Sequence, residues 1–223
     1  MKRLRTIQSD LRGFTITEMM IATMVFSVIL LVISMGIVSF SNRYYKASNQ
    51  STTQNTARSI IDSISQAIQF GTANVFPSGV NNYFCAGGNL FMFDTTGAMY
   101  TGLAGQRGVY MVPMDGIAMA GSLCHNQSLL SGQQLLGERM RITQLSVVQI
   151  PAVSNMYSIS ISIAYGDNDL LCAPSTHPSS CDSTAVTLTD AQLRASPDVT
   201  CKGRTGSQFC ATSRLTTTVQ KRV

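Results

Sequence analysis

The sequence predicts an α+β protein in which one long N-terminal helix packs on an antiparallel β-sheet domain. An uninterrupted apolar segment near the amino terminus is followed by a polar stretch and then by an apolar stripe at helical spacing. Short runs of alternating apolar and polar residues, typical of half-buried strands, occur in the remaining chain. We therefore expect four parts: residues 1–13 as a basic leader, 14–41 as the membrane-spanning half of the helix, 42–71 as its amphipathic half, and 72–223 as an extracytoplasmic, β-rich globular domain with a disulfide-stapled tail.

The apolar segment is long enough to cross a bilayer. Residues 14–41 form a run of 28 in which Glu18 is the only charged residue, and a helix needs about 20 apolar residues to span the hydrocarbon core. The leader ahead of it has four cations and one acid: Lys2, Arg3, Arg5, Arg12 and Asp10. Because Lys and Arg remain cytoplasmic, everything after Ser41 is expected outside the cytoplasm.

The junction between leader and apolar segment carries the most specific motif in the chain. A carboxylate at membrane depth is costly, so Glu18 calls for a role. Gly13-Phe14-Thr15 followed by Glu18 resembles the amino terminus of type IV prepilins and of the pseudopilins of type II secretion systems. The resemblance extends over residues 1 to about 70, and Thr17 departs from it, since that position is more often aliphatic.

This resemblance implies a pilin-like fold and a non-catalytic function. It implies that prepilin peptidase removes the leader between Gly13 and Phe14, that the new amine on Phe14 is methylated, and that Glu18 pairs with the terminal amine of a neighbouring subunit. The implied protein is a minor pilin or pseudopilin of a type IV pilus or type II secretion-like filament. Its partners would be other pilin or pseudopilin subunits, prepilin peptidase, the inner-membrane assembly platform and the membrane. It would be a single-pass inner-membrane protein before assembly and part of an extracytoplasmic filament afterwards.

The apolar segment has two other interpretations, a cleaved signal peptide and a plain membrane anchor. A signal peptide cut near Ser39-Phe40-Ser41 would have an apolar core of only 7–15 residues without an acid. A plain uncleaved anchor explains the length of the segment but not Gly13, Phe14 or Glu18. The alternative function is accordingly an uncleaved, membrane-anchored extracellular binding protein, an adhesin or DNA receptor.

The helix is expected to continue well beyond the membrane. The first proline is Pro77, and Phe70-Gly71 forms a plausible helix end. The membrane half lacks the proline that many pilins carry. Gly36 is the residue there at which the helix should deform most easily. An apolar stripe on one helical face should contact the domain: Ala57, Ile60, Ile61, Ile64, Ala67 and Ile68.

The β-rich region contains five expected strands, bounded by glycine-rich or polar segments. They are residues 89–93, 109–112, 140–150, 157–165 and 215–219. The 157–165 run alternates most clearly, with tyrosine and isoleucine on one face and serine and alanine on the other. Residues 166–210 lack such a pattern and are interpreted as a surface region, either a ligand-binding loop or a flap without a ligand.

All six cysteines lie in the part expected outside the cytoplasm, which favours disulfides. Six cysteines allow 15 connectivities. The first choice is sequential pairing: Cys85–Cys124, Cys172–Cys181 and Cys201–Cys210.

No pattern in the sequence indicates an enzyme or a cofactor. His125 and His177 lie in polar loops without the short paired ligand steps of a zinc site. Asp167 and Asp169 are weak calcium candidates, and a tight turn is the favoured interpretation of that segment.

Nucleic-acid binding is weakly supported. The net charge of +5 falls to about +2 without the leader. Basic residues do collect toward the carboxyl end, with Phe209 as the only aromatic among them, and a solvated basic surface is the favoured interpretation. They are Arg194, Lys202, Arg204, Arg214, Lys221 and Arg222.

Overall fold

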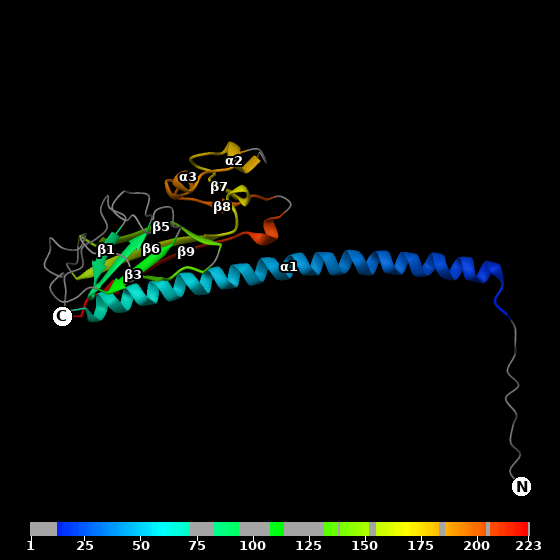
Figure 1. Cartoon of the computed structure of the whole chain (residues 1–223), viewed down its shortest axis with the longest axis horizontal. Helices are drawn as coiled ribbons and strands as arrows, with labels where there is room; N and C mark the ends of the chain where they lie inside the picture. The colour runs from blue at the N-terminus through cyan, green and yellow to red at the C-terminus, as the bar shows by residue number, and fades with distance from the viewer. Residues whose placement is uncertain are drawn as a thin grey trace, which may run out of the picture. The chain divides into compact units, whose positions relative to one another are not determined.

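The long helix is present as α1, Ile16–Phe70, in the computed structural model of the chain (Figure 1). Strands follow it, so the α+β arrangement is confirmed. The chain divides into two units, residues 1–43 and 44–223, and α1 contributes to both. The structure describes residues 13–71, 83–93, 108–113, 132–137, 139–151, 155–182, 186–203 and 206–222.

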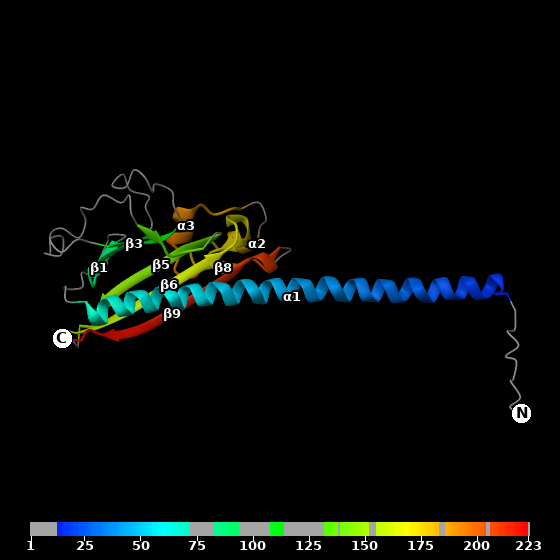
Figure 2. The same ribbon diagram turned by 60° about the horizontal axis from the view of Figure 1, so that its bottom comes forward.

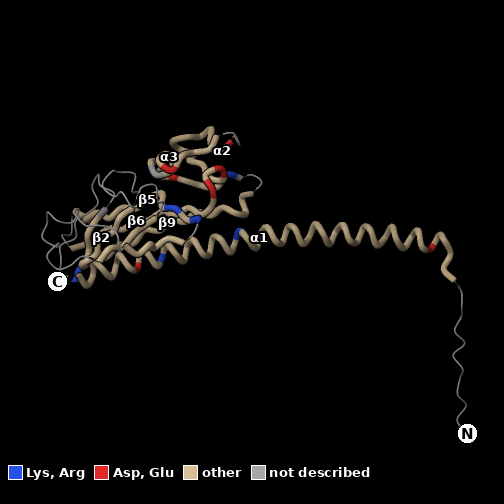
Figure 3. The backbone as a smooth tube through the Cα atoms, viewed as in Figure 1, with Lys and Arg blue, Asp and Glu red and all other residues tan. Residues whose placement is uncertain are grey.

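The part of α1 in the first unit has a fully exposed apolar surface. Every residue from 13 to 40 is exposed, including large side chains such as Leu30 and Phe40. Figure 3 shows this half of the helix free of charge apart from an acid near its start. Among the described residues, α1 is the one helix long and apolar enough to cross a membrane.

The part of α1 in the second unit buries the stripe that the sequence predicts, except that Ala67 is less buried than expected and Thr53 is buried as well. Ala67 is only half-buried, although it packs against the core, and Thr53 is fully buried. Thr53 is accommodated because its hydroxyl donates to the backbone oxygen of Asn49 at 2.7 Å. The buried residues are Thr53, Ala57, Ile60, Ile61, Ile64 and Ile68.

The first sheet is antiparallel and has the order β1-β2-β3-β4. Its strands are β1 Tyr83–Ala86, β2 Asn89–Phe93, β3 Val109–Pro113 and β4 Gln133–Gln134. The sequence predicted β2 and β3 but not the other two. β1 is only four residues long, and β4 is two glutamines without an apolar pattern.

The second sheet is also antiparallel and has the order β5-β6-β9. Its strands are β5 Met140–Gln149, β6 Met156–Tyr165 and β9 Ala211–Gln220. Figures 1 and 2 show the three strands side by side, with the second half of α1 running along them. The sequence predicted a single sheet, and the structure corrects this to two larger sheets that share one core with α1.

The imperfect alternation of β5 is caused by a bulge. Ile142 faces Ile163 and Gln144 faces Ser162, so Thr143 is an extra residue between them. The Thr143 hydroxyl donates to the backbone oxygen of Ser162 at 3.1 Å. The bulge therefore lets β5 keep its apolar side chains on the core face on both sides of Thr143.

One core joins the helix and both sheets. On β6 the predicted alternation is confirmed, since Tyr157, Ile159, Ile161 and Ile163 are buried. They pack with the α1 stripe, with Leu136 just after β4, and with buried residues of the other strands: Phe84, Ala86, Phe91, Val109, Met140, Ile142, Leu145, Val147 and Val219.

The end of α1 is set by a close approach of two glycines. Gly71 does not adopt the left-handed conformation of a helix-capping glycine. Its Cα instead lies so close to Gly87, in the turn between β1 and β2, that a side chain would overlap the Gly87 backbone. Gly87 has φ +57° and itself abuts the backbone of Ala67. Glycine is thus required at both positions by space.

The polar region 166–210 also has structure of its own, which the sequence did not predict. A small separate core lies within it, formed with Ala164 and Cys210 by Leu171, Ala173, Leu188 and Leu193. Its short elements are η1 Asn168–Leu170, β7 Leu171–Cys172, α2 Ser179–Asp182, α3 Asp190–Arg194, β8 Thr200–Cys201 and η2 Ser207–Phe209. We refer to residues 166–210 as the tail module.

Replacing Ile64 by alanine tests the contact between α1 and the sheets. Ile64 is completely buried, so Ile64→Ala should leave a cavity and lower the free energy of unfolding by about 2–4 kcal/mol. Denaturant unfolding of the detergent-solubilised full chain, followed by circular dichroism, would measure it. Gln66→Ala, on the exposed face of the same helix, should change stability by less than about 0.5 kcal/mol. Equal effects of the two variants would contradict this packing.

Candidate functional site

Glu18 closes a capping box at the start of α1. Thr15 is the residue before the helix, and its hydroxyl accepts a hydrogen bond from the backbone N–H of Glu18 at 3.3 Å. Glu18 Oε2 in turn accepts from the backbone N–H and the hydroxyl of Thr15, each at 2.9 Å. This pairing was not predicted, although Thr15-Ile16-Thr17-Glu18 has the Thr-x-x-Glu signature of a capping box.

The capping box fixes the position of one acid at the positive end of a long helix. A carboxylate in the first turn is stabilised by the helix dipole and by the backbone N–H groups that lack partners there. All hydrogen bonds to the Glu18 carboxylate within residues 13–71 go to Oε2. The other oxygen, Oε1, therefore accepts none from the described part of the chain.

Gly13 and Phe14 precede the helix and are both exposed. Phe14 is 84% exposed, and nothing lies within 4 Å of a Cβ placed on Gly13. The peptide bond between them lies in non-helical chain immediately before the capping box. The three predicted site residues are thus collected within six positions, at one end of an apolar helix.

Three hydroxyl groups in the apolar segment are bonded within the helix itself. Thr23 donates to the backbone oxygen of Met20 at 3.0 Å, Ser27 to that of Thr23 at 2.7 Å, and Ser34 to that of Leu30 at 2.8 Å. Unsatisfied polar groups cost several kcal/mol in hydrocarbon. These internal bonds therefore suit a helix that is surrounded by lipid or by other apolar helices.

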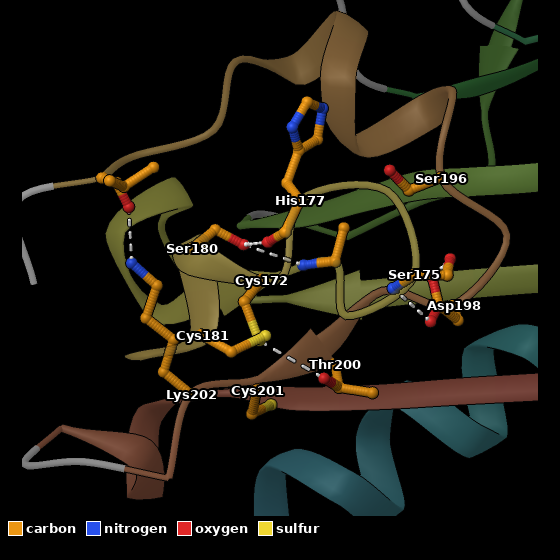
Figure 4. Close-up of a disulfide and its surroundings, with 12 residues drawn as sticks. Cys172, Ser175, His177, Ser180, Cys181, Ser196, Asp198, Thr200, Cys201 and Lys202 are labelled. Carbon is orange, nitrogen blue, oxygen red and sulfur yellow. Dashed lines mark hydrogen bonds between the residues drawn. A yellow bond between two sulfur atoms is a disulfide. The ribbon is translucent and has the colours of Figure 1, made fainter. Parts of the chain in front are cut away.

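Two disulfides cross-link the tail module. Cys172–Cys181 and Cys201–Cys210 are both present, and they are pairs that the sequence predicted. Figure 4 shows Cys172 beside Thr200, whose hydroxyl lies 3.5 Å from the sulfur. In the predicted pair Cys85–Cys124, Cys85 is buried on β1 and Cys124 lies outside the described residues.

A buried ion pair connects the tail module to the second sheet. Arg141 on β5 is buried, and its Nη1 lies 2.9 Å from Oδ1 of Asp190 at the start of α3. Its Nη2 donates to the backbone oxygen of Gly166 at 2.5 Å. Asn168 donates to the same Asp190 oxygen at 3.2 Å. One guanidinium therefore holds two separate segments of the tail module against the sheet.

The metal candidates do not converge on a ligand set. Asp167 and Asp169 are exposed, and the backbone N–H of Leu170 donates to the backbone oxygen of Asp167 at 3.0 Å, which closes a turn. The ring of His177 points away from the neighbouring disulfide (Figure 4), and His125 lies outside the described residues. Across the described residues, no three His, Cys, Asp or Glu side chains group as metal ligands would.

The structure describes the side chains of four of the six basic residues near the carboxyl end, and one of these four is buried. Lys202 is buried, and its Nζ donates to the backbone oxygen of Val186 at 2.8 Å. Arg222 lies over the Phe70 ring at 5.6 Å, while Arg214 on β9 is exposed. Arg204 and the side chain of Arg194 lie outside the described part. Lys202, at least, is removed from any basic surface because it serves the packing of the tail module.

No protein-family model matches the chain, and neither a curated protein nor a solved structure matches it. The geometry and chemistry above are therefore the basis for a functional assignment.

Removing the acid of the buried ion pair should loosen the tail module. Asp190→Ala leaves the Arg141 guanidinium buried without this carboxylate. The free energy of unfolding should fall by about 2–3 kcal/mol, less than the roughly 3–5 kcal/mol for a fully buried pair because Asp190 is partly exposed. Chemical denaturation of the full chain would measure the change. Asp62→Ala removes an exposed acid on α1 and should have almost no effect. A loss no larger than that control would contradict the structural role of the pair.

Proposed function

We propose that the chain is a type IV pilin-like subunit, a minor pilin or pseudopilin, which is trimmed by prepilin peptidase and assembled into a filament through its helix. The observation that carries the proposal is the junction at Gly13, Phe14 and Glu18. An exposed, non-helical cleavage point directly precedes a capped, wholly apolar helix with a single acid. The mechanism is structural and involves no catalysis by this chain.

Leader removal would change the electrostatics of the helix start. Cleavage after Gly13 creates a terminal amine on Phe14, which is cationic near neutral pH unless desolvation lowers its pKa. A cation at the positive end of its own helix is disfavoured by the helix dipole. Glu18, held there by Thr15, supplies the compensating negative charge.

A neighbouring subunit is the partner that best completes this arrangement. Glu18 Oε2 is engaged by Thr15, and Oε1 accepts no hydrogen bond from the described residues. The amine of an adjacent subunit could bind Oε1 while the exposed apolar surfaces of two helices pack together. A buried charge without a partner is strongly destabilising, so this pairing would also fix the stagger between subunits.

The length of the extracytoplasmic region favours a minor subunit over the main repeating one. Residues 166–210 add a cross-linked module with its own core to the helix and sheets. Such an addition suits a component present in few copies near a filament end, where surface loops contact other proteins.

The mass of the purified protein distinguishes this proposal from an uncleaved anchored binding protein. Expressed with the matching prepilin peptidase, the chain should begin at Phe14 and carry one additional methyl group. Intact-mass spectrometry and sequencing of the amino-terminal peptide would show it. A chain that keeps residues 1–13 under these conditions would overturn the proposal and favour the anchored alternative.

Variants at Glu18 and Thr15 separate subunit pairing from helix capping. Glu18→Gln keeps the size and the hydrogen bond to Thr15 but removes the charge, so filament incorporation should fall by about tenfold or more if an amine is left unpaired. Thr15→Val removes the capping hydroxyl but keeps the charge and should reduce incorporation far less. Sheared filaments from cells with the complete system, probed by immunoblot, give the measurement. Equal losses would assign Glu18 to capping alone.

A further inference from the structure

Three exposed aromatic rings form a cluster in the second unit. Tyr44 and Tyr45 lie on α1 and are 63% and 48% exposed, and Phe209 in η2 is 47% exposed. The ring centroids of Tyr44 and Tyr45 are 6.2 Å apart, and those of Tyr45 and Phe209 are 5.9 Å apart. We call these three residues the aromatic cluster. Its members come from segments more than 160 residues apart in the chain.

The tail module is built so that Phe209 reaches α1. The Cys201–Cys210 disulfide closes the segment that contains η2, and Cys210 is buried beside the exposed Phe209. Gly206, with φ +96°, turns the chain into η2. The side chain of Asn49 on α1 donates to the backbone oxygen of Gln208 at 3.0 Å. The disulfide, the glycine turn and the hydrogen bond thus together hold the ring of Phe209 in an exposed position next to two tyrosines.

The cluster begins directly after the apolar segment of the chain. Tyr44 follows Ser41, the last residue of the apolar segment, by three residues. Even a fully extended chain covers only about 11 Å over three residues. Chain connectivity alone therefore keeps Tyr44 and Tyr45 within about 11 Å of the end of the apolar segment, whatever the angle between the two units. Tyrosine is enriched at this depth because its ring is apolar and its hydroxyl is polar.

The charge next to the cluster also suits a lipid surface. Lys46, adjacent to Tyr45, is exposed and uncompensated by any acid between residues 42 and 61. A cation close to the bilayer is attracted to anionic headgroups by about 1 kcal/mol. Exposed rings flanked by a cation are the pattern of an interfacial membrane contact.

We propose that the aromatic cluster is a lipid-binding surface: Tyr44, Tyr45 and Phe209 insert into the headgroup region of the external leaflet while the chain resides in the membrane. The cross-linked η2 segment thereby acts as a second membrane contact besides the spanning helix. The proposal rests on the membrane-spanning half of α1 and is independent of leader cleavage.

Single tryptophans would report the contact, since the chain contains no tryptophan. Phe209→Trp places one in the cluster. Phe70→Trp is the matched control, because Phe70 is another exposed phenylalanine, 65% exposed, at the end of α1. It lies 25 residues beyond Tyr45, which is roughly 38 Å along the helix. Each full-chain variant would be reconstituted in phosphatidylethanolamine and phosphatidylglycerol vesicles with and without bromine near the headgroup ends of the acyl chains.

Bromine quenches only a tryptophan that lies close to it. Brominated lipid should reduce the Phe209→Trp emission by about half or more and reduce that of Phe70→Trp much less, because Phe70 is roughly 38 Å along the helix from the cluster. Tyr44→Trp should behave like Phe209→Trp and provides a second reading if η2 does not tolerate the larger ring. Quenching of Phe70→Trp equal to that of the cluster positions, or no quenching at any position, would overturn the proposal. A cluster tryptophan that is shielded only when other filament subunits are added would assign the surface to protein contacts instead.

This test and the mass measurement have separate outcomes. An uncleaved chain that still shows quenching would support the lipid contact and contradict the pilin-like function. A cleaved chain without quenching would do the reverse.

Discussion

The exposed apolar surface of α1 is the constraint on which the rest of the structure depends. Every side chain from residue 13 to residue 40 is exposed, and water is an unfavourable environment for so much contiguous apolar surface. Lipid or other apolar helices must cover it, and the internal bonds of Thr23, Ser27 and Ser34 suit either. Beyond Ser41 the same helix meets a different requirement, because one face must fit a folded domain. The chain satisfies both within one 55-residue element.

The domain is organised around that second requirement. The α1 stripe, the first sheet and the second sheet share one core, and glycines at 71 and 87 allow the end of the helix and a β-turn to touch. The tail module has a separate core and depends on Arg141 for its attachment to β5. The tail module is therefore stabilised largely by local disulfides and one buried ion pair, whereas the sheets are stabilised by extensive apolar packing.

The sequence predicted features that depend on periodicity over many residues. The helix, its buried stripe and β6 follow directly from regular spacing, and the two tail disulfides follow from equal cysteine intervals. Features that depend on a few residues were missed. The Thr143 bulge shifts an alternation by one position, and β4 is too short to have a pattern.

Contacts between segments that are distant in the sequence could not be predicted either. Nothing in the sequence brings Asp190 to Arg141, or Phe209 to Tyr45, because no local propensity encodes such pairs. At the candidate site, Glu18 was predicted to be functional because a carboxylate is energetically costly in a membrane. Its hydrogen bonds with Thr15 were not predicted, although the four-residue capping-box signature indicates them. Each of the two cross-links in the tail module joins cysteines nine positions apart, so a substitution inside either ring changes a short loop whose ends stay fixed. Changes within these rings should therefore be tolerated without altering the core that α1 shares with the sheets.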